Sequence, residues 1–230
     1  MVSQDTSTKE YWEAYYVELM KKTAALQKAH PRKLYSIEND DYADYDAIKE
    51  VLHIYLSERK NDRILILGNG ISSVAERVWG DGWINVTCVD FSSTVVEYMN
   101  AKTSDLEGMA WMQADMRRKT LLPSDSFDVI IEKAMIDVVL TGLRGVDDMM
   151  SVLLEVMRLL KPGGYFVSIT GNANPHSRLP YYKQLQYNED EDASNDRNAF
   201  DASEYWKCDT ITIPGLPHVH TIICKRGKVS

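Results

Sequence analysis

The chain has 230 residues, a length that fits one large α/β domain or two small ones. Hydrophobic residues make up 44% of the chain, enough for a packed core, and the net charge of −8 argues against a general affinity for nucleic-acid phosphates. No apolar run reaches the ~20 residues of a membrane span, and Met1 to Glu10 lacks an apolar signal core, so a cytoplasmic protein is expected.

Residues 1–60 predict helices and no strand. One helix is expected over residues 9–29 and a second over residues 44–58, and Pro31 ends the first. The first helix begins with a cluster of aromatic side chains, namely Tyr11, Trp12, Tyr15 and Tyr16. We therefore expect residues 1–60 to form a helical cap on a single domain that spans residues 1–230.

A glycine turn follows the first expected strand. The apolar run 63–67 leads into Gly68-Asn69-Gly70, and a helix pattern follows over residues 72–79. This order of strand, turn and helix holds a nucleotide-type cofactor at the carboxyl end of the strand. The turn lacks the third glycine of the common motif and the acidic residue that many such turns carry on the strand. Alone it fits NAD, FAD, S-adenosylmethionine or no ligand.

Strands and helices then alternate along the chain. Besides residues 63–67, the expected strands are the apolar runs 84–89, 109–113, 127–131 and 165–170. Further helices are expected over residues 92–102, with Ser92 as the cap, and over residues 146–160. Continuous apolar strands separated by helices indicate a parallel sheet buried on both faces.

The last part of the chain breaks this alternation. Residues 205–213 and 218–225 predict two strands joined at Pro214-Gly215-Leu216-Pro217, an antiparallel hairpin that closes the sheet. The expected fold is α/β, a doubly wound, Rossmann-like seven-stranded sheet that is mostly parallel with a C-terminal antiparallel hairpin. Residues 188–201 are acidic and polar, which predicts a mobile surface insertion.

The three cysteines are isolated in the sequence. Cys88 and Cys224 lie in apolar strand-like runs, which favours buried free thiols over a disulfide. No cysteine pair, Cys208 included, has zinc-like spacing, and no metal is expected.

Two acidic residues stand at the ends of expected strands. Asp90 comes 20 residues after Gly70, where a carboxylate can accept both ribose hydroxyls of NAD or S-adenosylmethionine; a helix cap is the alternative. Asp115 follows the third strand, where its carboxylate can accept the exocyclic amine of adenine while the backbone N–H of Met116 reaches a ring nitrogen. Asp115 and the closing hairpin favour S-adenosylmethionine over NAD.

The tract Leu160-Lys161-Pro162-Gly163-Gly164 resembles the one before the fifth strand of class I S-adenosylmethionine-dependent methyltransferases. Nearly the whole chain is similar to this family, and most similar to its elongation factor 1-alpha lysine methyltransferase branch. The tract from Phe127 to Lys133, with Asp137 after it, is the most specific element of that resemblance. In this branch, too, the turn lacks the strand acid, here Ile66, and has Ser72 in place of glycine.

The resemblance implies a set of contacts to S-adenosylmethionine. Gly68 allows the backbone to approach, Asp90 takes the ribose, Phe91 packs on adenine, and Lys133 pairs with the methionine carboxylate. The full set comprises Trp12, Tyr16, Tyr35, Gly68, Asn69, Gly70, Ser72, Asp90, Phe91, Asp115, Met116 and Lys133. Trp12, Tyr16 and Tyr35 would cover the methionine end, and core packing is the alternative for Trp12 and Tyr16. For Lys133 the alternative is a salt bridge to Glu132 or to a neighbouring acid.

The chain also departs from the branch. Asn69 stands where the branch often has cysteine, and Ile71 stands where it has asparagine. Ala134-Met135-Ile136 replaces a Gly-Thr-Leu tract beside the transferred methyl group. These differences leave cofactor binding in place and bear on the identity of the substrate.

The expected activity is methyl transfer from S-adenosylmethionine to a lysine side chain of a protein, with a translation elongation factor as the candidate substrate. An amine acceptor must arrive neutral, and a free lysine has a pKa of about 10.4, so desolvation or a base must lower it. Glu132, at the end of the fourth strand, is the candidate base. A small-molecule methyltransferase is the alternative activity. A non-catalytic S-adenosylmethionine-binding protein is an alternative without enzyme activity, and an NAD oxidoreductase is the least favoured function.

Overall fold

The computed structural model describes residues 5–30, 42–56, 60–172, 174–183 and 206–227. The sheet contains seven strands, namely β1 (Arg63–Leu67), β2 (Asn85–Asp90), β3 (Met109–Gln113), β4 (Phe127–Lys133), β5 (Leu160–Thr170), β6 (Trp206–Ile213) and β7 (Leu216–Arg226). The helices are α1 (Lys9–Ala29), α2 (Tyr45–Tyr55), α3 (Val74–Gly80), α4 (Ser93–Lys102), α5 (Met135–Val139), α6 (Gly145–Leu159), the 3-10 turn η1 (Pro175–Ser177) and α7 (Leu179–Lys183).

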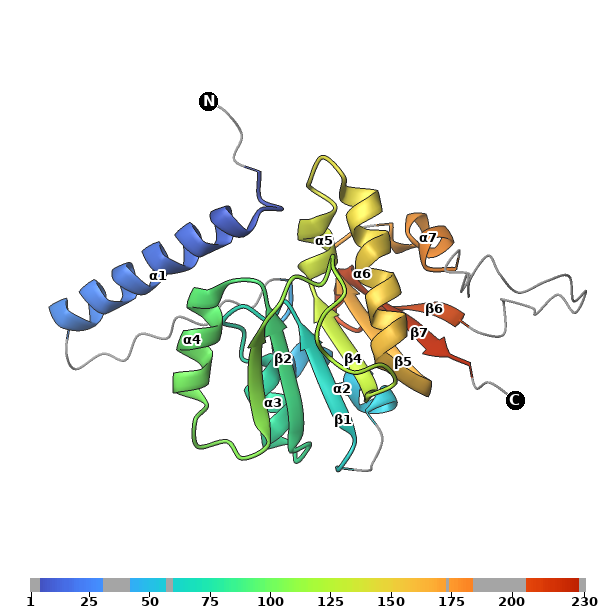
Figure 1. Cartoon of the computed structure of the whole chain (residues 1–230), viewed down its shortest axis with the longest axis horizontal. Helices are drawn as coiled ribbons and strands as arrows, with labels where there is room; N and C mark the ends of the chain where they lie inside the picture. The colour runs from blue at the N-terminus through green and yellow to red at the C-terminus, as the bar shows by residue number, and fades with distance from the viewer. Residues whose placement is uncertain (1–4, 31–41, 57–59, 173, 184–205, 228–230) are drawn as a thin grey trace, which may run out of the picture.

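The strands lie in the order β3-β2-β1-β4-β5-β7-β6 (Figure 1). Strands β1 to β5 are parallel, and β7 pairs antiparallel with both β5 and β6. The predicted doubly wound sheet with a closing hairpin is therefore confirmed. Parallel strands that cross over by helices place their carboxyl ends on one edge, so Leu67, Asp90 and Lys133 end at the same side of the sheet.

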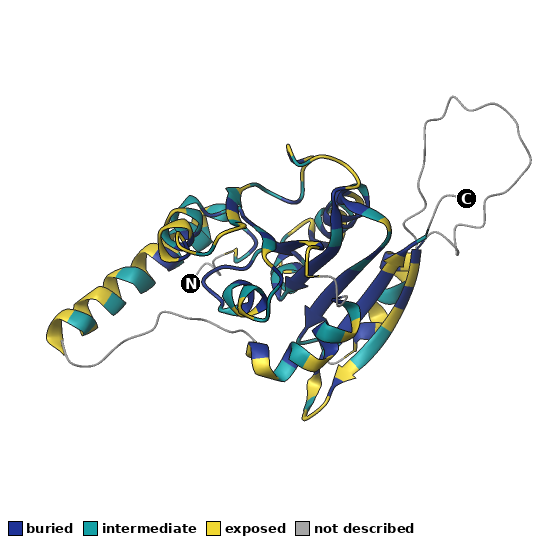
Figure 2. Ribbon diagram, turned by 90° about the horizontal axis from the view of Figure 1, so that it is seen from below, coloured by how far each residue is buried: buried dark blue, intermediate teal, exposed yellow. Residues whose placement is uncertain are grey.

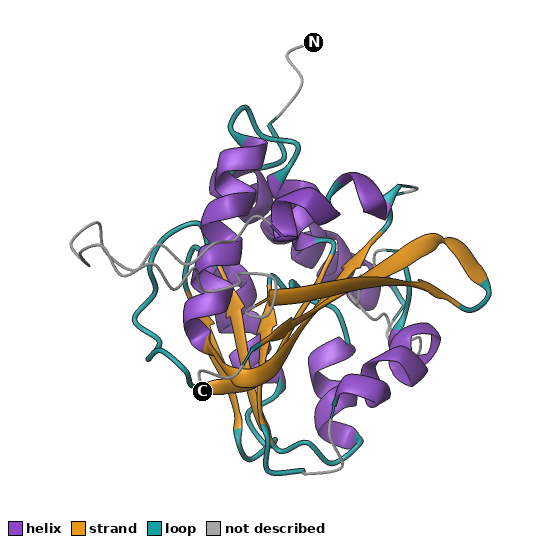
Figure 3. Ribbon diagram, turned by 90° about the vertical axis from the view of Figure 1, so that its right-hand side faces the viewer, coloured by secondary structure: helices purple, strands orange, loops and turns teal. Residues whose placement is uncertain are grey.

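Helices pack on both faces of the sheet (Figure 3). One apolar core contains side chains of α2, α3 and α4, such as Leu52, Val78 and Met99. The other lies under α5, α6 and α7 and contains Ile136, Val156 and Tyr182. The central strands β1 and β4 are buried on both faces (Figure 2), which explains why they read as continuous apolar runs in the sequence.

Polar side chains cap the beginnings of three helices. The predicted cap Ser92 accepts a hydrogen bond from Val95 N at 3.2 Å, and Thr8 and Asp44 accept equivalent bonds at the starts of α1 and α2. The predicted element boundaries differ most at β5, which begins at Leu160 instead of residue 165. The Lys161–Gly164 tract lies in an irregularity of the β4–β5 ladder, because Phe127 pairs with Leu160 and Val129 already pairs with Tyr165.

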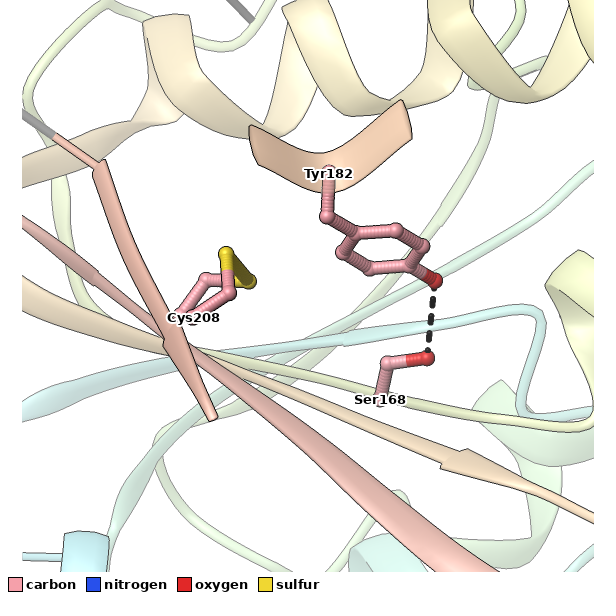
Figure 4. The surroundings of a disulfide bond; sticks show 4 residues. Ser168, Tyr182 and Cys208 are labelled. Atoms are coloured by element: carbon pink, nitrogen blue, oxygen red, sulfur yellow. Dashed lines mark hydrogen bonds between the residues drawn. A yellow bond between two sulfur atoms is a disulfide. The ribbon is translucent and has the colours of Figure 1, made fainter. Parts of the chain in front are cut away.

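The prediction for Cys224 is wrong, because Cys224 forms a disulfide with Cys208 (Figure 4). The two residues stand directly opposite each other in the β6–β7 ladder. They are 16 positions apart in the chain, and only the register of the hairpin brings them together. Cys88 is a buried free cysteine, as predicted.

The predicted insertion at residues 188–201 and the candidate Tyr35 fall outside the described residues. Within the described part of the chain, no helix has both the length and the apolar character needed to cross a bilayer.

Candidate active site

The turn after β1 needs glycine at two positions. Gly68 and Gly70 have φ angles of 55° and 54°, in the left-handed region that favours glycine. Other side chains also approach them closely: a Cβ on Gly68 would lie 2.6 Å from Cγ of Met135, and one on Gly70 would lie 2.4 Å from the hydroxyl of Tyr16. The Asn69 side chain fixes the turn by donating to Ser72 O at 2.9 Å. The glycines thus let α1 and α5 approach the turn.

Asp90, the last residue of β2, connects this turn to α4. Its carboxylate accepts hydrogen bonds from Gly70 N at 3.0 Å and from Ser92 N at 2.9 Å. The side chain is buried, and this burial raises the pKa of Asp90 to about 6 against the lowering effect of the two backbone donors. A carboxylate oxygen can accept two hydrogen bonds, so both oxygens of Asp90 can still accept one from a ligand hydroxyl.

Two adjoining cavities open at the carboxyl edge of the sheet. The larger, of about 710 Å³, contains eight predicted cofactor-binding residues in its lining: Trp12, Tyr16, Gly68, Asn69, Ser72, Asp90, Phe91 and Lys133. The second, of about 440 Å³, contains the predicted Asp115 and Met116. Five residues line both cavities, namely Gly68, Asp90, Phe91, Met135 and Val138. The two cavities therefore meet at Asp90 and Met135.

Lys133 ends β4 and lines the larger cavity. Its ammonium donates a hydrogen bond to the carbonyl of Ala43 at 3.1 Å. Adjacent residues of a strand point to opposite faces of the sheet, and Glu132 is directed to the other face, against Ser168 and Ile136. The alternative of a salt bridge between Lys133 and Glu132 is therefore wrong.

Glu132, the predicted catalytic base, lines neither cavity. It is 1% exposed, and its carboxylate accepts hydrogen bonds from the hydroxyl of Ser168 and from Ile136 N. Burial, and next the negative charge of Asp137, raises the pKa of Glu132 to about 7. The Ser168 hydroxyl also bonds that of Tyr182 at 3.2 Å (Figure 4), which completes a buried polar group beneath α5 and α7. The structure thus directs Glu132 toward α5 on the other face of the sheet from Lys133, outside the lining of both cavities.

Asp115 lies in the second cavity with its carboxylate already bonded by Arg117. Nε and Nη2 of Arg117 donate to Asp115 at 2.9 and 2.8 Å, and Arg117 N donates at 3.0 Å. Burial opposes ionisation of Asp115, but these hydrogen bonds prevail and lower its pKa. Arg117 also donates to the carbonyl of Ser7 at 3.2 Å, so it joins this loop to the segment before α1.

Two aromatic residues of α1, Trp12 and Tyr16, line the larger cavity. The ring centroids of Trp12 and Tyr16 are 5.6 Å apart, and the indole N–H of Trp12 donates to Thr6 O at 2.7 Å. Tyr16 is 7% exposed and also belongs to the apolar core beside α2. The sequence offered core packing and a place in the cofactor site as alternatives for Tyr16. In the structure Tyr16 does both, since it packs in the core and lines the cavity.

Several residues that line the cavities were not among the predicted cofactor-binding residues. Arg117 and Ser7 line the second cavity, and Met135 lies between the two cavities. The spacing of Arg117 two residues after Asp115 is a signal that could have indicated their pairing. Met135 belongs to the tract where this chain departs from the branch that it resembles.

Residues 65–168 match a family described as a methyltransferase domain. The match begins in β1 and ends in β5, so it includes the glycine turn, Asp90, Asp115 and Lys133.

Among curated proteins, the chain is 38% identical over 154 residues, or 64% of its length, to EEF1A lysine methyltransferase 4 of Bos taurus. It is 29% identical over 73% of its length to eEF1A lysine and N-terminal methyltransferase of Danio rerio. The chain spans 59% of the length of the first relative and 22% of the second.

Solved structures share the fold. The N-methyltransferase NodS from Bradyrhizobium japonicum, solved with S-adenosyl-L-homocysteine, aligns with a TM-score of 0.60 at 12% identity over 92% of this chain and 97% of its own. A SAM-dependent methyltransferase from Methanosarcina mazei aligns with a TM-score of 0.51 at 19% identity over 78% of this chain and 98% of its own. The seven-stranded sheet with its closing hairpin is the fold of these enzymes.

Proposed function

We propose that the chain is an S-adenosylmethionine-dependent methyltransferase that acts on a lysine side chain of a protein, since residues 65–168 match a methyltransferase domain and the chain shares the fold of solved methyltransferases. The observation that carries the cofactor assignment is the pair of joined cavities with Asp90 where they meet and Lys133 in the larger one. The lysine acceptor is supported by the relatives, two of which are named as lysine methyltransferases of eEF1A.

The residues present fit this cofactor. An apolar cavity beside Asp115 and Met116 suits adenine, and the buried carboxylate of Asp90 suits a ribose that donates two hydroxyls. The ammonium of Lys133 suits a carboxylate at the methionine end. Trp12 and Tyr16, on the first turns of α1, would cover that end and exclude water. Gly70 lines neither cavity, and we assign it a role in the turn after β1, where its backbone N–H donates to Asp90.

S-adenosylmethionine supplies a methyl group that its sulfonium already activates, so the chain mainly needs to align the acceptor and exclude water. An apolar lining such as Met135 and Val138 would desolvate the incoming ammonium and favour its neutral form. We assign Glu132 a supporting role, because its carboxylate lines neither cavity and accepts hydrogen bonds from the start of α5 and from the Ser168 hydroxyl.

The test is transfer of labelled methyl from S-adenosylmethionine by the purified protein to recombinant elongation factor 1-alpha and to a whole-cell lysate. We expect labelled protein, with mass spectrometry placing the methyl group on lysine. Label confined to metabolites would instead indicate a small-molecule methyltransferase. Failure of S-adenosylhomocysteine to bind in calorimetry would remove both enzyme assignments, and a thermal shift with NADH alone would indicate an oxidoreductase.

A translation elongation factor works where proteins are synthesised, so we also propose a cytoplasmic location. Cell fractionation with an antibody to the chain tests this, and recovery in a membrane fraction would contradict it.

A further inference from the structure

We propose that Glu13 is a positioning residue that fastens the first turns of α1 over the active site and so controls how tightly the cofactor is held. The inference rests on the proposed function for the identity of the ligand. The fastening itself rests on contacts within the chain.

Glu13 binds the N-terminus of α4 with both carboxylate oxygens. Oε1 accepts from Ser93 N at 2.6 Å and from Ser93 Oγ at 2.9 Å, and Oε2 accepts from Ser92 Oγ at 3.0 Å and from Thr94 N at 3.2 Å. The first backbone N–H groups of a helix have no partner within the helix, and that end carries partial positive charge. An acidic side chain from α1 satisfies two of these donors.

The ionised form of Glu13 suits this position. Burial alone would raise the pKa of Glu13, but the hydrogen bonds from Ser92, Ser93 and Thr94 lower it to about 2. The carboxylate is therefore charged throughout the physiological range, and its hydrogen bonds are of the stronger, charge-assisted kind.

The contact between Glu13 and the start of α4 joins two elements that both carry residues of the site. On α1, Trp12 is the neighbour of Glu13, and Tyr16 is one helical turn away on the same side as Trp12; both line the larger cavity. On α4, Ser92 donates its backbone N–H to Asp90 and its hydroxyl to Glu13. One residue thus holds both the carboxylate assigned to the ribose and the helix that covers the methionine end.

Besides Glu13, the first half of α1 is held by apolar packing, because Trp12, Tyr15, Tyr16, Leu19 and Met20 contact the core beside α2. Tyr16 is the single buried residue of α1, and the half of the helix after Met20 projects from the body with mainly exposed side chains (Figures 1 and 2). A second attachment precedes the helix, where Ser7 O accepts from Arg117 at 3.2 Å and Thr6 bonds Thr141 at 2.8 Å. These two attachments flank the joined cavities, so loss of the Glu13 attachment would loosen α1 on one side of the site.

The experiment compares Glu13→Gln with the matched control Glu18→Gln in the full chain. Glu18 lies on the same helix and is mainly exposed, with Lys22 as its ion-pair partner. We expect E13Q to increase amide hydrogen exchange in residues 9–20 about tenfold without ligand, while β1 and β4 keep their protection. We also expect a rise of about tenfold in the dissociation constant for S-adenosylhomocysteine, and a higher KM for the cofactor with kcat unchanged.

A double-mutant cycle with Ser93→Ala separates fastening from general destabilisation. S93A removes the hydroxyl donor to Glu13, so it should weaken S-adenosylhomocysteine binding in the wild-type background and have no effect in the E13Q background. Equal effects in both backgrounds, or unchanged α1 exchange in E13Q, would overturn the fastening. A wild-type protein that does not bind S-adenosylhomocysteine would instead overturn the cofactor assignment, and α1 exchange in E13Q would still decide the fastening.

Discussion

Lys133 donates a hydrogen bond to the carbonyl of Ala43 at 3.1 Å, and this contact joins the end of β4 to the segment that precedes α2. Ala43 is buried, so the segment lies firmly against the edge of the sheet where the strands end. Lys133 therefore has a structural partner as well as its place in the larger cavity. Its proposed role toward a carboxylate must be measured apart from that structural contact.

Replacement of Lys133 by methionine keeps the length of the side chain and removes its charge. We expect K133M to weaken S-adenosylhomocysteine binding about tenfold or more, because a charge-assisted bond to the ligand carboxylate is lost. Binding of 5′-methylthioadenosine, which lacks that carboxylate, should be unchanged. Calorimetry with both ligands separates the two effects.

The control for this prediction is Lys161→Met. Lys161 pairs with Asp128 at 2.6 Å near the start of β4, away from both cavities, and its loss should leave both affinities unchanged. Equal weakening of both ligands by K133M would mean that Lys133 acts through its contacts within the chain and not through the ligand carboxylate.

Ala134 is held at a φ angle of 67°, a conformation that glycine adopts freely and alanine does not. The branch that the chain resembles has glycine in this tract. We expect A134G to raise the free energy of unfolding by about 1 kcal/mol, since the left-handed conformation costs an L-residue roughly that amount. Urea denaturation measures the change. The matched control is Ala101→Gly, at an exposed position in α4, which should lower the free energy of unfolding by about 1 kcal/mol. A loss of stability in A134G as well would contradict backbone strain at Ala134.

The variant Glu132→Gln first tests how the buried carboxylate changes stability with pH. The folded protein raises the pKa of Glu132 from its ordinary value of 4.5 to about 7. Between these values the folded state holds a proton that the unfolded state has lost, so stability falls as pH rises from 4.5 to 7. Glutamine cannot ionise, and E132Q should therefore be about as stable as the wild type at pH 4.5 and more stable above pH 7, by about 3 kcal/mol at most.

Activity provides the second measurement on this variant. Because Glu132 is buried and lines neither cavity, E132Q should keep its kcat when assayed at a temperature where both proteins are folded. Loss of kcat with unchanged S-adenosylhomocysteine affinity would restore Glu132 as a catalytic base.

The fold could be predicted from the sequence because its strongest signals are local. The strands β1 and β3 match their predicted bounds, since an apolar run ending at a glycine or an acidic residue fixes both the strand and its end. The closing hairpin was visible from two apolar runs around Pro214 to Pro217. The disulfide was not visible, because pairing of Cys208 with Cys224 depends on the hairpin register, which neither cysteine specifies by itself.

The candidate site was predictable where residues follow a strand. Asp90, Asp115 and Lys133 all line the cavities, because the carboxyl ends of parallel strands meet at one edge. Glu132 shows the limit of that rule: its position at a strand end is right, but the alternation of the strand turns it to the other face. The contact between Glu13 and α4 joins segments about 80 positions apart, and no local pattern indicates it.

The disulfide itself yields a last prediction. In the denatured but unreduced protein, a thiol-alkylating reagent should label Cys88 and leave Cys208 and Cys224 unlabelled; after reduction it should label all three. The bond closes a loop of 16 positions, so reduction, or a Cys208→Ser/Cys224→Ser variant, should lower the free energy of unfolding by about 3 kcal/mol through the entropy of the unfolded chain. Binding of S-adenosylhomocysteine should not change, because the β6–β7 hairpin lines neither cavity. Labelling of all three cysteines without reductant would contradict the disulfide, and weaker ligand binding after reduction would mean that the hairpin supports the site.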